Sequence, residues 1–539
     1  MSLLSPLLLQ HFTANTSRGF DWPPKTSPSD PTNRDFGPKQ TSFVGSAASH
    51  QMTKAITYSS LKPSLKNPLI SFTFQLHILN MDTTAAYPTT HILVYPYPSS
   101  GHTIPSLHLI HHLLLQPNLT LTVLLIPSNA TLLTPLLPLF HTTLHTLLLH
   151  PPDLLPFTGP SHKQDIFAKM FTLRELNAQI ISWFDSHPSP PVAIISDFFL
   201  GWTTKLADQL GIKRLVFSPS GALDLNIMNS LWLNRPQCIK PSTEKSEFSF
   251  PELPGSPVFS THHLCNLYPE IDPEDQEWND FTEFWSDNMA SYGVVVNSLT
   301  ELESVHFDYL KTQLGHSRVW AVGPLASLTE RVETTAFHEV ITWLDRKEDD
   351  SVVYVCFGSR TILTRQQMEA VSIGLDRSGV DFVLCLGNDT TVDFDVVLEG
   401  YEDRVNGRGL VLKGWAPQMA ILSHRAVGSF VTHCGWNSVL EGLSAGVVML
   451  TWPMGAEQFV NAKLLVDELG VGIRLGESSQ KVPDADEVAR VVIQAMRGSK
   501  MERESARKLQ KLALAAVNGG SSKMEWDEMV KSLTQLGRG

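Results

Sequence analysis

The chain has 539 residues, of which 42% are hydrophobic and 18% are charged, and its formal net charge at pH 7 is -13. This length exceeds what one hydrophobic core serves, and the composition is not that of a disordered chain, so we expect two or three globular domains. The acidic balance argues against nucleic acid as the main partner, and no apolar run reaches the ~18 residues of a membrane-spanning helix.

Residues 1–80 differ in composition from the rest of the chain. They contain seven Lys and Arg, three Asp and no Glu, which gives a formal charge of +4 and leaves -17 for residues 81–539. A basic leader that is rich in Ser and poor in acidic residues is typical of an organelle transit peptide. A disordered tail, or untranslated sequence joined upstream of a true start at Met81, is the interpretation that we favour.

From Met81 onward, short apolar runs alternate with longer amphipathic stretches. In the first half the pattern predicts a helix over 102–116 and strands over 91–95, 121–127, 192–199 and 213–219. In the second half it predicts a helix over 364–377 and strands over 351–359, 381–387, 409–415, 427–433 and 447–453. Strands that alternate with helices and are rich in apolar, β-branched residues indicate parallel sheets covered on both faces.

The two halves predict two doubly wound α/β domains of the Rossmann-like kind. We place the first domain at 81–325, a linker at 326–335 and the second domain at 336–521. Open sheets of this kind bind ligands at the carboxyl ends of their strands. Candidate functional residues should therefore lie just after strands.

Two titratable residues of the first half meet this condition. His102 follows the strand 91–95 at the start of the predicted helix, where the positive helix end keeps an imidazole neutral. A neutral imidazole accepts a proton from a hydroxyl, and a buried carboxylate fixes its tautomer. Asp197 ends the apolar strand VAIIS (192–196), where an unpaired charge is costly. Without further evidence, His102 could also be a helix-capping residue or a residue of the hydrophobic core.

The most informative stretch runs from Trp415 to Gln458. Within it, a buried strand ends at His433, and after a short turn a helix begins at Asn437 and Ser438, which are good N-caps. A helix N-terminus offers unpaired N–H groups and about half a positive charge, and so binds anions. Ser359 follows another strand in a similar small loop. Ordinary helix capping also explains these residues when they are considered one at a time.

Taken whole, the stretch from Trp415 to Gln458 resembles the signature box of plant UDP-sugar-dependent glycosyltransferases, and the resemblance covers residues 88–535. It implies the GT-B fold, in which two Rossmann-like domains face a central cleft and the second domain holds the nucleotide sugar. It also implies a final helix, at 522–539, that returns to the first domain.

The resemblance implies a role for each residue of the donor site. Trp415 stacks on uracil, the main chain of Ala416 contacts the base, Gln418 reaches the uridine, and Glu441 binds the ribose. The diphosphate is held by Ser359, His433, Asn437 and Ser438. The transferred sugar is bound by Glu457 and Gln458, with Trp436 beside it.

The family's catalytic histidine and its activating aspartate fall at His102 and Asp197. The resemblance therefore implies that His102 deprotonates the acceptor hydroxyl, which attacks the anomeric carbon from the face opposite the diphosphate. UDP leaves, and the configuration inverts from α to β without a covalent intermediate.

The sequence predicts neither a metal ion nor another cofactor. The D-x-D strings at 393–395 and 484–486 lie in charged, loop-like sequence, and we interpret them as solvated surface. The cysteines form no C-x-x-C pair, which argues against a zinc site or a disulfide framework and favours a reducing compartment, the cytoplasm. The five cysteines are Cys238, Cys265, Cys356, Cys385 and Cys434.

Gln458 resembles the residue of glucose-using members, so UDP-glucose is the predicted donor, with UDP-linked rhamnose, xylose, galactose or glucuronic acid as alternatives. The acceptor should be a flavonoid, another small phenol or a terpenoid, in a pocket lined from the aromatic-rich segments 157–185 and 219–295. We expect a monomer. A dinucleotide oxidoreductase is disfavoured because no G-x-G-x-x-G follows a strand. A non-catalytic UDP-sugar binder is the remaining alternative.

Overall fold

The computed structural model describes residues 89–152, 162–234, 246–264, 276–325, 335–387, 400–478 and 480–537. The predictions for the leader 1–80, for most of the linker 326–335 and for the D-x-D string at 393–395 lie outside the described residues. In the part of the chain that is described, no helix combines the length and the apolar character needed to cross a membrane.

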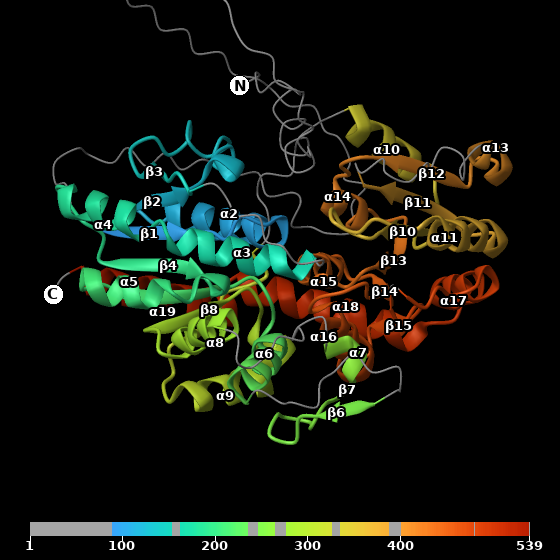
Figure 1. Ribbon diagram of the computed structural model, residues 1–539. Helices are drawn as coiled ribbons and strands as arrows, with labels where there is room; N and C mark the ends of the chain where they lie inside the picture. Colours follow the sequence, from blue (N-terminus) through green and yellow to red (C-terminus); the bar gives the residue numbers. More distant parts are fainter. Residues whose placement is uncertain are drawn as a thin grey trace, which may run out of the picture.

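The first half forms a seven-stranded parallel sheet in the order β3-β2-β1-β4-β5-β8-β9. Its strands are β1 (Thr90–Tyr95), β2 (Leu119–Leu125), β3 (Leu144–Leu148), β4 (Ala193–Asp197), β5 (Lys213–Ser218), β8 (Gly293–Val296) and β9 (Val319–Ala321). Helices connect the strands and cover the sheet (Figure 1): α2 (Ser100–Leu114), α3 (His162–Arg174), α4 (Asn177–Ser186), α5 (Thr203–Leu210), α6 (Ala222–Asn234), α8 (Gln276–Met289) and α9 (Thr300–Leu314). An antiparallel hairpin, β6 (Glu247–Ser249) and β7 (Val258–Ser260), leads into the short α7 (Thr261–Leu264).

The second half forms a six-stranded parallel sheet in the order β12-β11-β10-β13-β14-β15. Its strands are β10 (Val352–Cys356), β11 (Asp381–Leu386), β12 (Gly409–Lys413), β13 (Val427–Thr432), β14 (Val448–Thr451) and β15 (Gly472–Arg474). Its helices are α10 (Thr335–Asp345), α11 (Arg365–Ser378), α13 (Tyr401–Val405), α14 (Gln418–Leu422), α15 (Trp436–Ala445), α16 (Gln458–Lys463), α17 (Ala485–Arg497) and α18 (Lys500–Val517).

The predicted strands correspond to β1, β2, β4, β5 and β10 to β14. Every residue of β1 and of β13 is buried, as expected for parallel strands covered on both faces. The sequence did not predict β3, β8, β9 and β15. Three of these have only three or four residues, and β3 is a largely exposed edge strand within a Leu-rich run, so none shows a clear strand pattern.

The last helix, α19 (Ser521–Leu536), packs against β9 of the first sheet, although it follows the second sheet in the sequence. Figure 1 shows α19 among the elements of the first half. Trp526, Met529 and Leu533 are its buried apolar residues. Ser532 of this helix hydrogen-bonds the Tyr292 hydroxyl at 3.0 Å. The end of the chain is thus anchored on the first half.

Strand order determines where a ligand can bind. In each sheet the chain winds outward in both directions from a pair of adjacent strands, β1 and β4 in the first sheet and β10 and β13 in the second. Such a switch point leaves a crevice at the carboxyl ends of the two strands. His102 follows β1 and Asp197 ends β4, whereas Ser359 follows β10 and His433 follows β13.

Candidate active site

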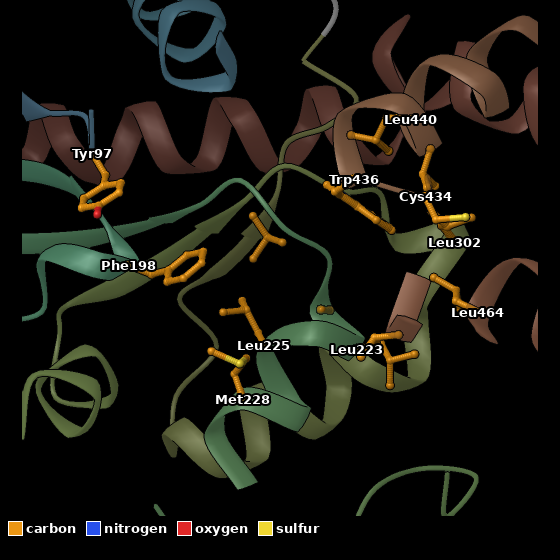
Figure 2. Close-up of a cluster of buried hydrophobic side chains, with 14 of the residues drawn as sticks. Tyr97, Phe198, Leu223, Leu225, Met228, Leu302, Cys434, Trp436, Leu440 and Leu464 are labelled. Atoms are coloured by element: carbon orange, nitrogen blue, oxygen red, sulfur yellow. The ribbon is translucent and has the colours of Figure 1, made fainter. Parts of the chain in front are cut away.

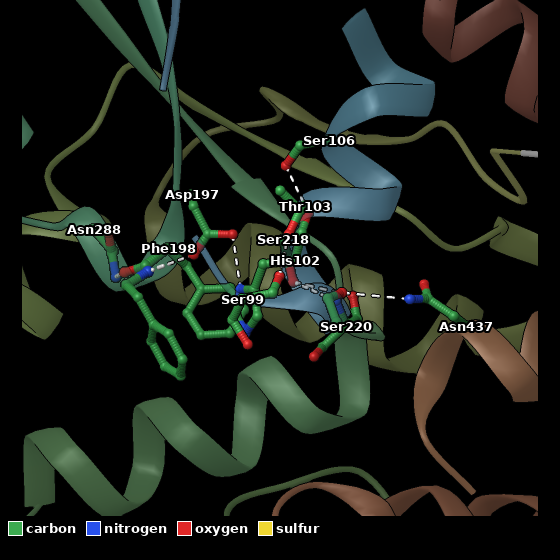
Figure 3. A network of polar contacts seen from close by, with 12 residues as sticks. Ser99, His102, Thr103, Ser106, Asp197, Phe198, Ser218, Ser220, Asn288 and Asn437 are labelled. Atoms are coloured by element: carbon green, nitrogen blue, oxygen red, sulfur yellow. Dashed lines mark hydrogen bonds and ion pairs between the residues drawn. The ribbon is translucent and has the colours of Figure 1, made fainter. Parts of the chain in front are cut away.

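His102 and Asp197 form a hydrogen-bonded pair (Figure 3). The Nδ1 atom of His102 lies 2.8 Å from Asp197 Oδ2, and the side chains are 15% and 0% exposed, respectively. The other carboxylate oxygen accepts a hydrogen bond from the backbone N–H of Phe199 at 2.9 Å. Because an ionised carboxylate only accepts hydrogen bonds, Nδ1 of a neutral His102 carries the proton and Nε2 is left as the basic nitrogen.

Aromatic side chains surround the imidazole of His102. Phe199 stacks on it with a centroid distance of 4.8 Å and an interplanar angle of 29°. Tyr97 meets it edge-on at 5.2 Å, and the Phe198 ring lies 5.5 Å away. These rings restrict the orientation of the imidazole and shield its bond to Asp197 from water.

Arg214, which the sequence analysis missed, supports the loop that carries Asp197. Its buried guanidinium donates hydrogen bonds to the side chains of Ser196 at 2.8 Å, Asn288 at 2.9 Å and Ser291 at 2.8 Å. It also donates to the backbone carbonyl of Asp197 at 3.3 Å. Burial lowers the pKa of Arg214 to about 9, which still leaves it charged at neutral pH. The arginine that follows Lys213 at the start of the otherwise apolar strand β5 was the available signal.

The residues expected at the uridine form one connected group. Gln418 donates from Nε2 to the Ser438 hydroxyl at 2.9 Å and to the Glu441 carboxylate. Its Oε1 accepts a hydrogen bond from the buried Tyr354 hydroxyl at 3.3 Å. Trp415 is 37% exposed, so part of its indole is available for stacking. Next to it, Ala416 packs on the hydrophobic core.

His433 lies between two glycines. A Cβ atom at Gly358 or at Gly435 would come within 2.7 Å or 2.6 Å of the ring, respectively, so neither position tolerates a side chain. Burial lowers the pKa of His433 to about 4, which makes the ring neutral at physiological pH. Its buried Nδ1 has no hydrogen-bond partner among the residues that the structure describes. A neutral imidazole of this kind can donate one hydrogen bond and adds no charge.

Ser99 and the first two residues of α2, Ser100 and Gly101, contact the second half of the chain directly. Ser359 donates a hydrogen bond to the Ser100 hydroxyl at 3.3 Å. Asn437 donates to the Gly101 carbonyl at 3.4 Å, as Figure 3 shows. The N-termini of α2 and α15 therefore lie close together, with the predicted diphosphate residues directly beside the turn that carries His102. We call this region the junction.

Gln458 and Glu457 occupy the loop where α16 begins. Gln458 Oε1 accepts hydrogen bonds from the backbone N–H groups of Met454 at 2.8 Å and Gly455 at 3.0 Å. The Nε2 amide group is therefore the part of the Gln458 side chain that can donate a hydrogen bond to a sugar hydroxyl. Burial raises the pKa of the Glu457 carboxyl, while the nearby charge of Arg360 acts to lower it.

Trp436 packs between the two halves of the molecule (Figure 2). It is 3% exposed, and its indole N–H donates to the Asn297 carbonyl at 2.7 Å. A Cβ atom at Gly221, which precedes α6, would come within 2.9 Å of the Trp436 ring. The indole thus fixes α15 against the first half of the chain, and its predicted place beside the sugar stays a prediction.

A buried carboxyl on α6 was also missed. Asp224 is 3% exposed, and its Oδ1 has no hydrogen-bond partner among the described residues. Burial raises the pKa of Asp224 well above its ordinary value, and the charge of Glu457 raises it further. Asp224 belongs to the segment 219–295, which is expected to line the acceptor pocket. Its carboxyl interacts electrostatically with Glu457 of the predicted sugar-binding loop.

The D-x-D string at 484–486 has structural contacts. Asp484 caps α17 by accepting a hydrogen bond from the Glu487 backbone N–H at 2.8 Å, and the exposed Asp486 pairs with Arg377 at 2.8 Å. Among the described residues, no group of three or more His, Cys, Asp and Glu side chains is arranged to hold a metal ion.

Residues 338–499 match the family model described as "UDP-glucoronosyl and UDP-glucosyl transferase". Flavonol 3-O-glucosyltransferase UGT89B1 of Arabidopsis thaliana is 43% identical to the chain over 469 residues, which covers 83% of the chain and 97% of that relative. The chain belongs to the plant UDP-glycosyltransferase family. It is therefore a glycosyltransferase, as the box from Trp415 to Gln458 predicted.

Solved structures of this UDP-glycosyltransferase family share the fold. Arabidopsis thaliana UGT89C1 complexed with UDP-L-rhamnose is similar with a TM-score of 0.68 and 34% identity, over 83% of this chain and 100% of that one. The same protein complexed with quercetin gives a TM-score of 0.66 and 34% identity, over 83% and 99% of the two chains. The predicted GT-B fold is confirmed.

Proposed function

We propose that this glycosyltransferase moves glucose from UDP-glucose to a hydroxyl of a flavonol or a related small phenol, with inversion at the anomeric carbon. The observation that carries the proposal is the position of the His102–Asp197 pair. The imidazole is hydrogen-bonded to a buried carboxylate, and Ser100 and Gly101 just before it bond to Ser359 and Asn437 of the second half. A base and the predicted diphosphate residues thus meet at one junction.

In the proposed reaction, Nε2 of His102 takes the proton of the acceptor hydroxyl. The acceptor oxygen forms a bond to the anomeric carbon while the bond from that carbon to the β-phosphate oxygen breaks, and its electron pair leaves with UDP. Asp197 stabilises the imidazolium that forms, which is the usual function of a carboxylate bonded to Nδ1. A single displacement of this kind converts an α-linked donor into a β-glucoside.

We propose that the leaving diphosphate is held by protein groups alone. The N-terminus of α15, the neutral imidazole of His433 and the side chains of Ser359, Asn437 and Ser438 would supply preorganised hydrogen-bond donors. No step then requires a metal ion. Transfer rates should stay the same in excess EDTA, and a loss of activity that Mg²⁺ or Mn²⁺ restores would contradict this part of the proposal.

For the donor, we propose that Trp415 stacks on uracil, that the Ala416 main chain contacts the base, and that Gln418 and Glu441 bind the uridine. Glu457 and the free Nε2 of Gln458 would bind hydroxyls of glucose. The donor could also be UDP-L-rhamnose, because the similar UGT89C1 structure is a complex with that nucleotide sugar. A comparison of the two donors at equal concentration distinguishes them.

For the acceptor, two similarities support a flavonol. One relative is a flavonol 3-O-glucosyltransferase, and one solved structure is a complex with quercetin. A planar phenol would also stack well on the aromatic side chains of Tyr97, Phe198 and Phe199, whose rings surround the imidazole of His102.

The test is to incubate the full chain with UDP-glucose and a panel of flavonols and simple phenols. We expect release of UDP and a product whose mass is greater by one hexose. Binding of UDP-glucose without transfer to any acceptor, or to water, would instead indicate a non-catalytic nucleotide-sugar binder.

A further inference from the structure

Arg360 brings a full positive charge to the junction. It follows Ser359 in the loop after β10, and its guanidinium donates a hydrogen bond to the Ser99 hydroxyl of the first half at 2.9 Å. Ser99 precedes α2 and lies three residues before His102. The Arg360 side chain therefore extends from the second sheet to the turn that carries the proposed base.

The surroundings of Arg360 indicate which ligand it faces. Its charge acts on the carboxyl of Glu457, so Arg360 and the predicted sugar-binding loop share one region. Ser359 and Asn437 bond to the neighbouring Ser100 and Gly101. Two helices of 15 and 10 residues, α2 and α15, begin at this place. Their positive ends repel one another unless an anion lies between them.

A diphosphate leaving group needs more positive charge than the other side chains provide. Each helix end supplies about half a charge, and His433 is neutral because burial lowers its pKa to about 4. Of the three side chains whose bonds reach from the second half to residues 99–101, those of Ser359 and Asn437 are uncharged. Arg360 is thus the group among them that can neutralise charge as UDP departs.

We infer that Arg360 binds the β-phosphate of the UDP-sugar and stabilises the negative charge that develops on it as the glycosidic bond breaks. This inference rests on the proposed function. The guanidinium exchanges the Ser99 hydroxyl for phosphate oxygens, to which its planar donors are well matched. It keeps all its protons throughout, since His102 takes the proton of the acceptor hydroxyl. Arg360 is then a catalytic residue that the sequence analysis did not identify.

The test measures the affinity of the full chain for UDP, UMP and uridine by calorimetry. In Arg360→Gln, which keeps the side-chain length and removes the charge, we expect UDP affinity to fall about 10- to 100-fold, as for a lost hydrogen bond to a charged group. Uridine affinity should be unchanged, and UMP affinity should change little. Arg360→Lys keeps the charge but loses the planar, two-pronged set of N–H donors. Its UDP affinity should lie between that of Arg360→Gln and that of the wild type.

Arg365→Gln is the matched control, because Arg365 lies five residues further on, is 66% exposed and pairs with Glu369 rather than with the junction. It should bind UDP as the wild type does. Equal UDP affinity in Arg360→Gln and the wild type would overturn the inference, as would an equal loss for UDP and uridine, which indicates a structural effect. A wild-type chain that binds none of the three ligands would overturn the proposed function, and the inference with it.

Discussion

The two sides of the junction hold their polar groups in different ways. On the first side, His102 bonds to Asp197, and Arg214 holds the Asp197 loop, so every partner belongs to the same sheet and its helices. On the second side, Ser359, Arg360 and Asn437 bond to residues 99–101 of the other half. The difference suggests that the base is preorganised by its own domain, whereas the donor residues exchange partners when a nucleotide sugar binds.

Replacing His102 with Ala should have the largest effect. Loss of a general base lowers the rate by about 10²- to 10⁴-fold, so kcat for transfer should fall by that factor. UDP affinity should stay within a few-fold of the wild type, because the donor residues belong to the other side. Activity and calorimetry on the same preparation measure both. Undiminished transfer by His102→Ala would show that another group is the base.

Replacing Arg214 with Met tests whether the first side is held by its own domain. Several buried oxygen atoms would lose their donor, which should lower the free energy of unfolding by about 3 kcal/mol. Because the Asp197 loop is then less fixed, kcat should fall while UDP affinity is kept. Urea unfolding measures the stability, with the exposed Arg365→Met as control, expected within about 0.5 kcal/mol of the wild type. If Arg214→Met were as stable and as active as the wild type, Arg214 would not be needed to hold the His102–Asp197 pair in place.

The lowered pKa of His433 predicts how the free energy of unfolding depends on pH. Its pKa is about 4 in the folded chain, below the ordinary 6.5, so the unfolded chain binds more protons between these values. Neutral His433 therefore contributes fully to the free energy of unfolding above pH 6.5. This contribution, up to roughly 3 kcal/mol, is lost as the pH falls toward 4. His433→Gln should show a shallower loss of unfolding free energy over this window. Identical slopes for the two proteins would refute the assignment.

Replacing Gln458 with Glu should have the smallest effect on activity. This variant distinguishes the function of the Oε1 acceptor from that of the Nε2 donor. A Glu oxygen can still accept from the Met454 and Gly455 N–H groups, whereas the Nε2 donor is lost. We expect the KM for UDP-glucose to rise about 10-fold and UDP affinity to stay the same. Gln458→His should shift the preference toward UDP-galactose. Unchanged use of glucose by both variants would remove Gln458 from the sugar site.

The sequence predicted the parts of the fold that leave a periodic pattern. Buried strands such as β10 consist of continuous apolar residues, and parallel topology then brings residues such as His102 and Asp197 together, although they are 95 positions apart in the chain. The short strands β8, β9 and β15 were missed because three or four residues by themselves show little periodic pattern.

The individual side-chain contacts between the halves could not be predicted, because they depend on how the two sheets are placed. The sequence pattern identifies Trp436 and Gln458 as part of the box. It does not reveal that the indole donates to Asn297 or that Gln458 Oε1 closes its own turn. Arg360 lies outside the box, and its position at the junction becomes visible only when the loop after β10 meets the start of α2.

The most direct test of the account is the anomeric configuration of the product. The full chain would be incubated with UDP-glucose and an accepted phenol, and the glycosidic linkage would be read from the anomeric proton coupling by NMR. A single displacement by a hydroxyl that His102 deprotonates predicts only the β-glucoside. An α-glucoside would require retention, and with it a mechanism in which His102 is not the base of a one-step transfer.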